Sequence, residues 1–250
     1  MPIIESGGDP SGRARKAALI AGVFYLVTFV SIPALLLIGP ALDDQYVLSA
    51  DSDTRVLLGG LLETVTALAC VGTAVALYPV LRRQNETLAL GFVTARVFEA
   101  ALIMVGIVSL LAVVTLRQEA GGTSATSPDA LVTAGQSLVA VKDWTFLLGP
   151  GIMPAINALL LGTLLYQSRL VPRILPVIGL AGAPLLLVSS VATLFGANEQ
   201  VSVLSALAGL PIAAWELALG IYLVVRGFKP APLSAKEQPA ALRRTPLPVA

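Results

Sequence analysis

The stretch LALGFVTARVFEAALIMVGIVSLLAVVTL, residues 88–116, is long and apolar enough to cross a bilayer as one helix, since about 20 apolar residues suffice. It nevertheless carries Arg96 and Glu99 near its middle. A charge at the centre of a bilayer costs at least about 2.5–3.5 kcal/mol, so it needs a partner or a wet cavity. The two residues are three positions apart and share a helix face, where they can pair. We therefore predict a transmembrane helix whose charged face turns toward other helices.

The composition of the whole chain indicates a membrane protein. Of its 250 residues, 56% are hydrophobic and 12% are charged, whereas a soluble domain carries about 25% charged residues. The only cysteine is Cys70, and the chain has no histidine. An internal disulfide, a thiol cluster, a histidine-ligated metal and a nucleophile activated by imidazole are thereby excluded. We assign no catalytic residue, no metal site and no cofactor.

The apolar runs predict an all-α fold, a polytopic membrane bundle of six transmembrane helices. We expect the spans at 17–38, 56–81, 88–116, 144–166, 174–195 and 201–225. The chain then divides into an N-terminal tail at 1–16, a transmembrane domain at 17–226 and a disordered, proline-rich tail at 227–250.

Prolines, glycines and one acid mark where these helices should bend or begin. Pro33 should bend the first span, and Gly149-Pro150-Gly151 the fourth. Asp53, with Thr54, is predicted to cap the start of the second span. One helix over 129–166 would measure about 58 Å, more than a bilayer core needs. We therefore predict a short interfacial helix at 129–141 and a break before Trp144.

The distribution of lysine and arginine predicts the orientation, because these residues concentrate on the cytoplasmic side of membrane proteins. Twelve of the 16 fall in the N-terminal tail, the 82–86 turn, the 168–173 turn and the region after 225. Only Arg55, Arg117 and Lys142 fall in the opposite loops, which carry most of the acids. Both termini are therefore predicted to be cytoplasmic.

Four ionisable residues fall well inside the predicted spans: Glu63, Arg96, Glu99 and Glu216. On the second span, Glu63 shares a stripe with small and hydroxyl residues, namely Gly59, Thr66, Cys70 and Thr73. On the sixth span, Glu216 shares one with Ser202, Ser205, Gly209, Ala213 and Gly220. On the fourth span, Asn157 lies close in angle to Pro150 and Pro154. We predict one polar core built from the second, third, fourth and sixth spans, with Arg96 at its centre.

This predicted core holds three acids and one base. Desolvation favours the neutral form of a carboxyl group, so we expect at least one of Glu63, Glu99 and Glu216 to be protonated at neutral pH. The alternative is that the core binds a cationic or proton-linked species. A purely structural role is equally open, because buried Arg–Glu pairs also fix helix register and small-residue stripes serve helix packing.

Motifs spread over the membrane region carry a resemblance to a bacterial family. They are RKAALIAG at 15–22, TRVLLG at 54–59, ARVFEA at 95–100, DWTFLLGPG at 143–151 and WE at 215–216. Over residues 13–228 the chain resembles the domain of unknown function 4386 family. The resemblance implies a six-helix, multi-pass protein of the bacterial plasma (inner) membrane with no assigned activity.

Three hypotheses for the function follow from these residues. The first is a small-solute or proton/cation-linked permease or binding protein that uses Glu63, Arg96, Glu99, Asn157 and Glu216 as its internal polar site. A water-accessible cavity that reaches these residues would support it. The second is a non-catalytic membrane scaffold or sensor subunit that packs with a partner, which a filled core and an exposed small-residue groove would support.

An intramembrane enzyme acting on a lipid-like substrate ranks last, because without histidine it would need Glu or Asp as its base. The expected partners are the lipid bilayer and an unknown small solute or cation. No basic aromatic face indicates nucleic acid.

Overall fold

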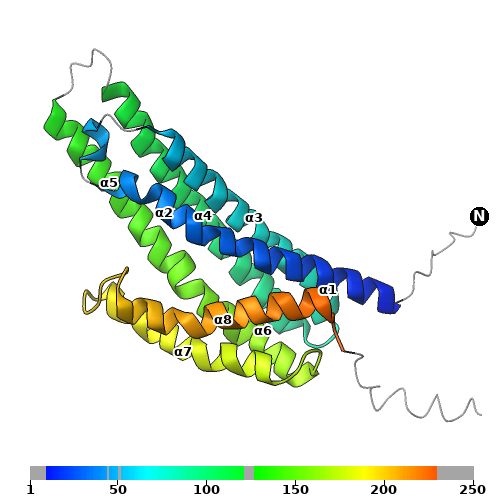
Figure 1. Ribbon diagram of the computed structural model, residues 1–250. Helices are drawn as coiled ribbons and strands as arrows, with labels where there is room; N and C mark the ends of the chain where they lie inside the picture. The colour runs from blue at the N-terminus through cyan, green and yellow to red at the C-terminus, as the bar shows by residue number, and fades with distance from the viewer. Residues whose placement is uncertain (1–9, 44, 50–51, 121–126, 230–250) are drawn as a thin grey trace, which may run out of the picture.

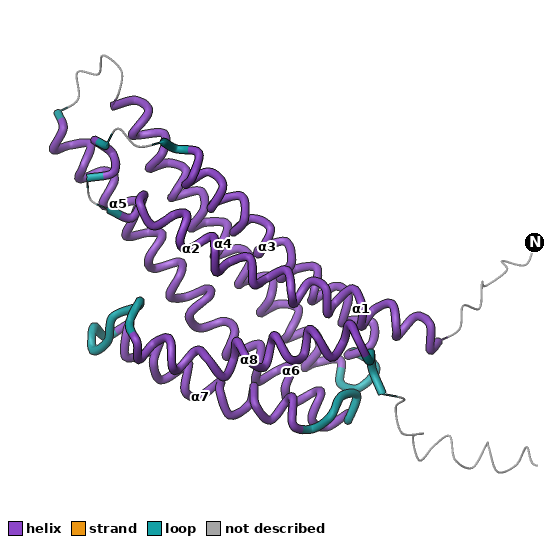
Figure 2. The backbone as a smooth tube through the Cα atoms, viewed as in Figure 1, coloured by secondary structure: helices purple, strands orange, loops and turns teal. Residues whose placement is uncertain are grey.

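The computed structural model describes residues 10–43, 45–49, 52–120 and 127–229, and these form helices joined by short loops, without a strand among them (Figure 2). Six helical segments in this part of the chain are long and apolar enough to cross a membrane. They are Gly12–Leu42, Thr54–Leu81, Glu86–Ala120, Pro128–Ser168, Ile174–Leu194 and Val203–Val225. The prediction of an all-α bundle with six transmembrane helices is confirmed.

The first span is broken, as Pro33 predicted. It consists of α1 (Pro10–Val27), a 3-10 turn η1 (Thr28–Val30) and α2 (Ser31–Ile38). Proline lacks a backbone N–H, and its ring collides with the carbonyl four residues earlier, so the α-helical pattern cannot continue through Phe29. The helix already begins at Pro10, ahead of the expected start at residue 17. Two further 3-10 turns follow, η2 (Gly39–Leu42) and η3 (Tyr46–Leu48).

The second and third spans are α3 (Thr54–Leu81) and α4 (Glu86–Ala120), which pack against each other along their lengths. The capping role predicted for Asp53 is wrong in its mechanism. Asp53 occupies the N-cap position, but its side chain makes no capping hydrogen bond. It binds Arg117 near the end of α4 instead, because a nearby guanidinium is a stronger partner for a carboxylate than a backbone N–H.

The fourth span is α5 (Pro128–Phe146), a π-helix η4 (Leu147–Ile152) and α6 (Met153–Ser168). The predicted break before Trp144 is wrong, because α5 runs through that position without interruption. The distortion falls at Gly149-Pro150-Gly151, where a kink was predicted. Within this distorted stretch, the Gly151 carbonyl accepts a hydrogen bond of 2.8 Å from the Ser190 hydroxyl on α7.

The last two spans are α7 (Ile174–Leu194) and α8 (Val203–Val225), and they form a hairpin that crosses the longer helices at an angle (Figure 1). α8 packs against α1 and α7. The contact with α1 is close because it lies between two glycines: a Cβ added to Gly22 would lie 2.7 Å from the Gly220 carbonyl oxygen. Small residues bring helix backbones together in this way inside membranes.

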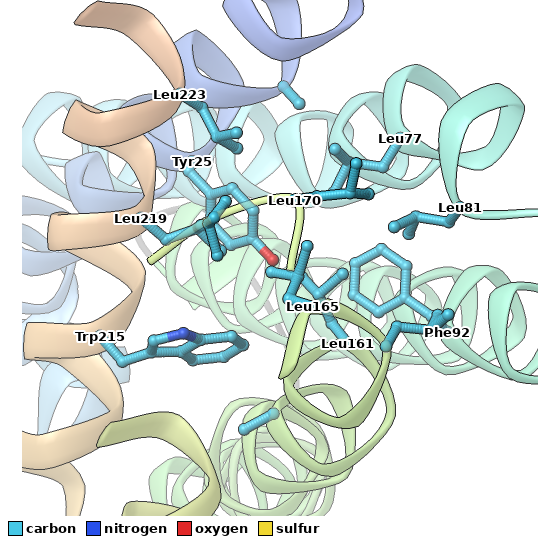
Figure 3. Close-up of a cluster of buried hydrophobic side chains, with 14 of the residues drawn as sticks. Tyr25, Leu77, Leu81, Phe92, Leu161, Leu165, Leu170, Trp215, Leu219 and Leu223 are labelled. Atoms are coloured by element: carbon cyan, nitrogen blue, oxygen red, sulfur yellow. The ribbon is translucent and has the colours of Figure 1, made fainter. Parts of the chain in front are cut away.

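The two ends of the bundle differ in packing. We call the end that holds Pro10 and Val225 the proximal end and the opposite one, with the α7–α8 turn, the distal end. A group of buried side chains fills the proximal half (Figure 3), and we call it the proximal cluster: Tyr25, Leu77, Leu81, Phe92, Leu161, Leu165, Leu170, Trp215, Leu219 and Leu223. Both ends of the described chain lie at the proximal end (Figure 1). Most of the predicted tails, 1–9 and 230–250, lies outside the described residues.

Candidate functional site

Arg96 on α4 lies at the centre of a buried ionic cluster. It is 1% exposed. Its Nη1 donates to Glu99 Oε2 at 3.0 Å and its Nη2 to Glu216 Oε1 at 3.1 Å. The first contact is within one helix, whereas the second joins α4 to α8. One guanidinium thus holds two carboxylates from different spans, which its fork of donors allows.

Asn157 on α6 completes this cluster. Its Nδ2 donates to Glu99 Oε2 at 2.7 Å, so that this one oxygen accepts from both Asn157 and Arg96. Asn157 Oδ1 and Arg96 Nε are buried without a hydrogen-bond partner among the described residues. The cluster therefore keeps unused acceptor and donor capacity. We call Arg96, Glu99, Asn157 and Glu216 the Arg96 cluster.

Aromatic rings form the proximal side of the Arg96 cluster. The guanidinium carbon lies 5.0 Å from the centre of the Tyr25 ring and 6.0 Å from that of Phe92. Both rings belong to the proximal cluster, and their faces attract the cation. Cys70 Sγ on α3 lies 3.6 Å from Arg96 Nη1. Arg96 is thereby fixed by contacts from α1, α3, α4 and α8.

Glu63, which was predicted to share the core of Arg96, has a base of its own. It pairs with Lys142 on α5, whose Nζ lies 2.8 and 2.6 Å from the two carboxylate oxygens. Both side chains are buried. The prediction that Lys142 is a loop cation is therefore wrong: α5 continues past it, so the lysine faces the bundle. This Glu63–Lys142 pair adds a second base to the core, which holds three acids and two bases.

A cavity of about 260 Å³ reaches both ionic groups. The charged residues at its surface are Glu63, Arg96, Glu99 and Glu216. Its walls are mostly apolar and include Phe29, Ile32, Leu35, Phe146, Leu186 and Ile212. The lining comes from every span, including both α2 and α8. α2 packs along α3 while α8 stays with α1 and α7, and the two helices diverge toward the distal end (Figure 1). Residues of both line the cavity, which therefore lies between them.

The proximal side of the cavity is closed. The proximal cluster lies directly behind the Arg96 cluster, since Tyr25 and Phe92 contact the guanidinium. Further along, Arg15 Nη1 donates to the Leu223 carbonyl at 3.0 Å and Nη2 to the Val224 carbonyl at 2.8 Å. These are carbonyls of the last turn of α8, which have no partner within the helix. Arg15 thus ties the start of α1 to the end of α8.

A third ionic group stands at the distal end, beyond the cavity. Asp53 accepts hydrogen bonds from Arg117 and, at 2.9 and 3.0 Å, from Gln118 and Tyr46. Burial acts to raise the pKa of this carboxyl, but the hydrogen bonds and the charge of Arg117 outweigh it, so its pKa lies below the ordinary value of 3.8. Desolvation, followed by the hydrogen bond to Asp53, raises the pKa of Tyr46.

The structure brings four of the five predicted site residues together in the Arg96 cluster, and the fifth, Glu63, lines the same cavity. The stripe on α3 is buried as predicted, at Gly59, Glu63, Thr66, Cys70 and Thr73. On α8, Gly209, Ala213 and Glu216 line the cavity. Among the described residues, no three histidine, cysteine or acidic side chains lie close enough together to hold a metal ion.

These features define an integral, multi-pass membrane protein with a cavity that meets buried charges inside its helical bundle. The chain belongs to the domain of unknown function 4386 family, whose model matches residues 20–227. No curated protein and no solved structure matches the chain.

Proposed function

We propose that the protein is a small-solute permease of the bacterial plasma (inner) membrane, with the cavity at the Arg96 cluster as its binding site. The observation that carries this proposal is the one-sided access to that site. The cavity reaches Arg96 and Glu216 from the distal half, whereas the proximal cluster closes the other side. Transporters bind their solutes near the middle of the membrane and expose the site to one side at a time.

The cavity favours solute binding over a purely structural use of the charges. Ion pairs that only fix helix register are best served by a filled core, because an empty cavity forfeits packing contacts. Here the two residues that join α4 to α8, Arg96 and Glu216, both lie at the cavity surface. A bound solute would exchange its hydration for these charges, which is what a binding site requires.

The orientation of the proposed permease follows from the basic residues at the proximal end. This end holds Arg82 and Arg83 on one turn and Arg169 and Arg173 on the next. Such basic turns support a cytoplasmic position for the proximal end. The cavity then opens in the half of the bundle nearer the outside of the cell.

Thiol labelling tests the accessibility of the site. In a Cys70→Ala background, Ala213→Cys places a thiol at the cavity surface, and Leu165→Cys places one in the proximal cluster. We expect N-ethylmaleimide to modify the first at least about tenfold faster than the second, because burial protects a thiol from reagents. Mass spectrometry of the intact protein measures both rates.

The same variants report the side of entry. A membrane-impermeant, charged thiosulfonate should reach Ala213→Cys more readily in spheroplasts than in inverted vesicles. Arg83→Cys, on the exposed α3–α4 turn, is the matched orientation control and should react only in inverted vesicles. Equal, slow modification of Ala213→Cys and Leu165→Cys by N-ethylmaleimide would contradict the proposal.

A second candidate function is a scaffold or sensor subunit, which one surface feature favours. An apolar groove runs between α4 and α6, with Thr87, Gly91 and Ala95 among its lining residues. Small residues spaced by four allow another helix to pack closely. If this groove binds a helix of a second subunit, Gly91→Leu should lower the oligomer mass in nanodiscs and leave Ala213→Cys labelling unchanged.

A further inference from the structure

The buried charges around the cavity do not balance. The described residues place three acids there, Glu63, Glu99 and Glu216, and two bases, Arg96 and Lys142. Lys142 contacts both oxygens of Glu63 at 2.6 and 2.8 Å, so that pair is compensated. Arg96 alone faces two carboxylates. With all five groups ionised, one negative charge remains, and it belongs to the Arg96 cluster.

Of the two acids in the Arg96 cluster, Glu216 is the one more exposed to the cavity. Its side chain is 14% exposed, against 6% for Glu99 and 2% for Arg96. Glu99 also accepts a hydrogen bond from Asn157. The Glu216 carboxylate, in contrast, has Arg96 as its one partner among the described residues, through Oε1. A ligand entering the cavity therefore meets an acceptor that is only half satisfied.

The walls of the cavity that Glu216 lines suit an organic cation better than a metal ion. A metal cation needs several oxygen ligands, whereas the walls here are formed largely by Phe29, Phe146, Ile212 and other apolar side chains. Two aromatic side chains line the same cavity as this carboxylate, and ring faces attract ammonium groups, as the Phe146 ring does with Lys142 Nζ at 5.8 Å. The volume of about 260 Å³ lies below that of most drug-sized pockets, about 300–1,000 Å³. It therefore fits one ring or a short chain.

The rim of the cavity indicates where such a ligand enters. Ile32 on α2 lines the cavity and is 57% exposed, and Leu210 on α8, next to the lining residue Gly209, is 60% exposed. Both are exposed apolar side chains on helices long and apolar enough to cross a membrane. The space between α2 and α8 is therefore flanked by exposed apolar side chains, in addition to the distal access that the charged reagent tests, and a molecule with an apolar body can pass along them.

We propose that the solute is a small amphiphilic organic cation, an amine with an apolar body, which enters from the bilayer between α2 and α8 and places its charge against Glu216. This inference rests on the proposed function and specifies its substrate class.

Three ligands of similar shape and different charge test the proposal. Benzyltrimethylammonium is the cation, neopentylbenzene its neutral counterpart and phenylmethanesulfonate the anion. Each is added to the Cys70→Ala/Ala213→Cys protein in nanodiscs, and the rate of N-ethylmaleimide modification is measured. We expect the cation to slow the reaction at least about tenfold, and the neutral and anionic compounds to change it less than about twofold.

Glu216→Gln identifies the carboxylate that selects the cation. It should raise the concentration of benzyltrimethylammonium needed for protection at least about tenfold. Glu199→Gln removes an acid from the exposed α7–α8 turn and should change nothing, which makes it the matched control. If Glu216→Gln does not fold, the comparison of the three ligands on the parent protein decides alone.

The outcomes separate this inference from the proposed function. Equal protection by all three ligands would show a binding cavity without charge selection, and would overturn the cation proposal alone. Protection by none of them, with Ala213→Cys still reactive, would also overturn it and would leave a proton as the balancing charge. An unreactive Ala213→Cys would remove the proposed function itself.

Discussion

The proximal and distal halves of this bundle contain the same spans but pack them differently. In the proximal half, α1 lies against α8 through Gly22 and Gly220, and large apolar side chains fill the space behind them. In the distal half, α2 follows α3, α8 departs, and a cavity opens between them. The buried charges lie at the boundary between the two halves. Beyond the cavity, the distal ends of α2 to α5 pack again around buried side chains that include Ile38, Val56 and Leu110. The charges therefore lie beside the cavity, between two packed groups.

The break in the first span falls where its neighbours change. α1 packs against both α3 and α8, whereas α2, beyond the turn at Thr28–Val30 that Pro33 imposes, packs against α3. The cavity lies beside this second part of the span, which lines it with Ile32 and Leu35.

Removing Arg96 should have the largest effect on this arrangement. Arg96→Leu leaves Glu99 and Glu216 without their shared cation, and breaking a buried ion pair costs about 3–5 kcal/mol. We expect a loss near the upper end of that range, measured by unfolding in mixed micelles. Arg83→Leu, on an exposed turn, is the control and should cost less than about 0.5 kcal/mol. A loss below about 1 kcal/mol for Arg96→Leu would mean that the boundary carries no ionised pair.

Lys142→Met should cost somewhat less, about 3 kcal/mol, because it leaves a single carboxylate, Glu63, without a partner. The double variant Glu63→Gln/Lys142→Met removes both charges and should recover most of the loss. Unfolding of the two single variants and the double variant gives the coupling energy directly. Additive losses would contradict the pairing of these side chains.

Gly220→Leu compares the two halves on one helix. Its Cβ would lie 3.1 Å from Tyr25 Cβ and 3.3 Å from the Gly22 carbonyl oxygen, and overpacking of this kind costs about 1–3 kcal/mol. Gly209→Leu, on the distal part of α8, is the matched control, because nothing lies within 4 Å of its added Cβ. We expect Gly209→Leu to change the free energy of unfolding by less than about 0.5 kcal/mol. Equal losses would show that the halves are packed alike.

Asp53→Asn should have the smallest effect, about 1 kcal/mol or less at pH 7, since the group is near the surface. The pKa of Asp53 is lowered in the folded protein, so its contribution is present above its ordinary pKa of 3.8 and is lost as the pH falls through the folded value. The difference between wild type and Asp53→Asn should therefore shrink below about pH 3.8. Thermal unfolding at pH 7 and at pH 3 measures this difference, and a difference that grows in acid would mean that folding raises the pKa of Asp53.

The sequence was sufficient for the parts of the site that depend on one helix at a time. Arg96 and Glu99 had to pair because they are three residues apart at membrane depth. Glu216 and Asn157 had to face inward because lipid offers them no partner. These constraints are local, so spacing and the cost of burying charge predict them.

Lys142 and the cavity depend on the arrangement of several helices, and the sequence did not reveal them. The sequence places Lys142 among the loop cations, because the length of a bilayer core predicts a break before Trp144. The helix is instead longer than the bilayer core, and its lysine meets Glu63. The cavity depends on the angle at which α2 leaves α8, which no spacing along the chain encodes. The predicted spans hold three acids and only one base. This imbalance was the one indication in the sequence of a second buried base.

The π-helix at Leu147–Ile152 is an irregular joint between α5 and α6, so a small rotation there would move the far end of α5 by a larger distance. The helix reaches from that pivot to Pro128, over 19 residues or about 28 Å. A rotation of about 10° at the pivot would move its far tip by about 5 Å, while side chains beside the pivot would shift by only a fraction of that. A pair of spin labels at the tip and on the α7–α8 turn would therefore magnify any motion of the fourth span into a distance change that pulsed resonance can resolve.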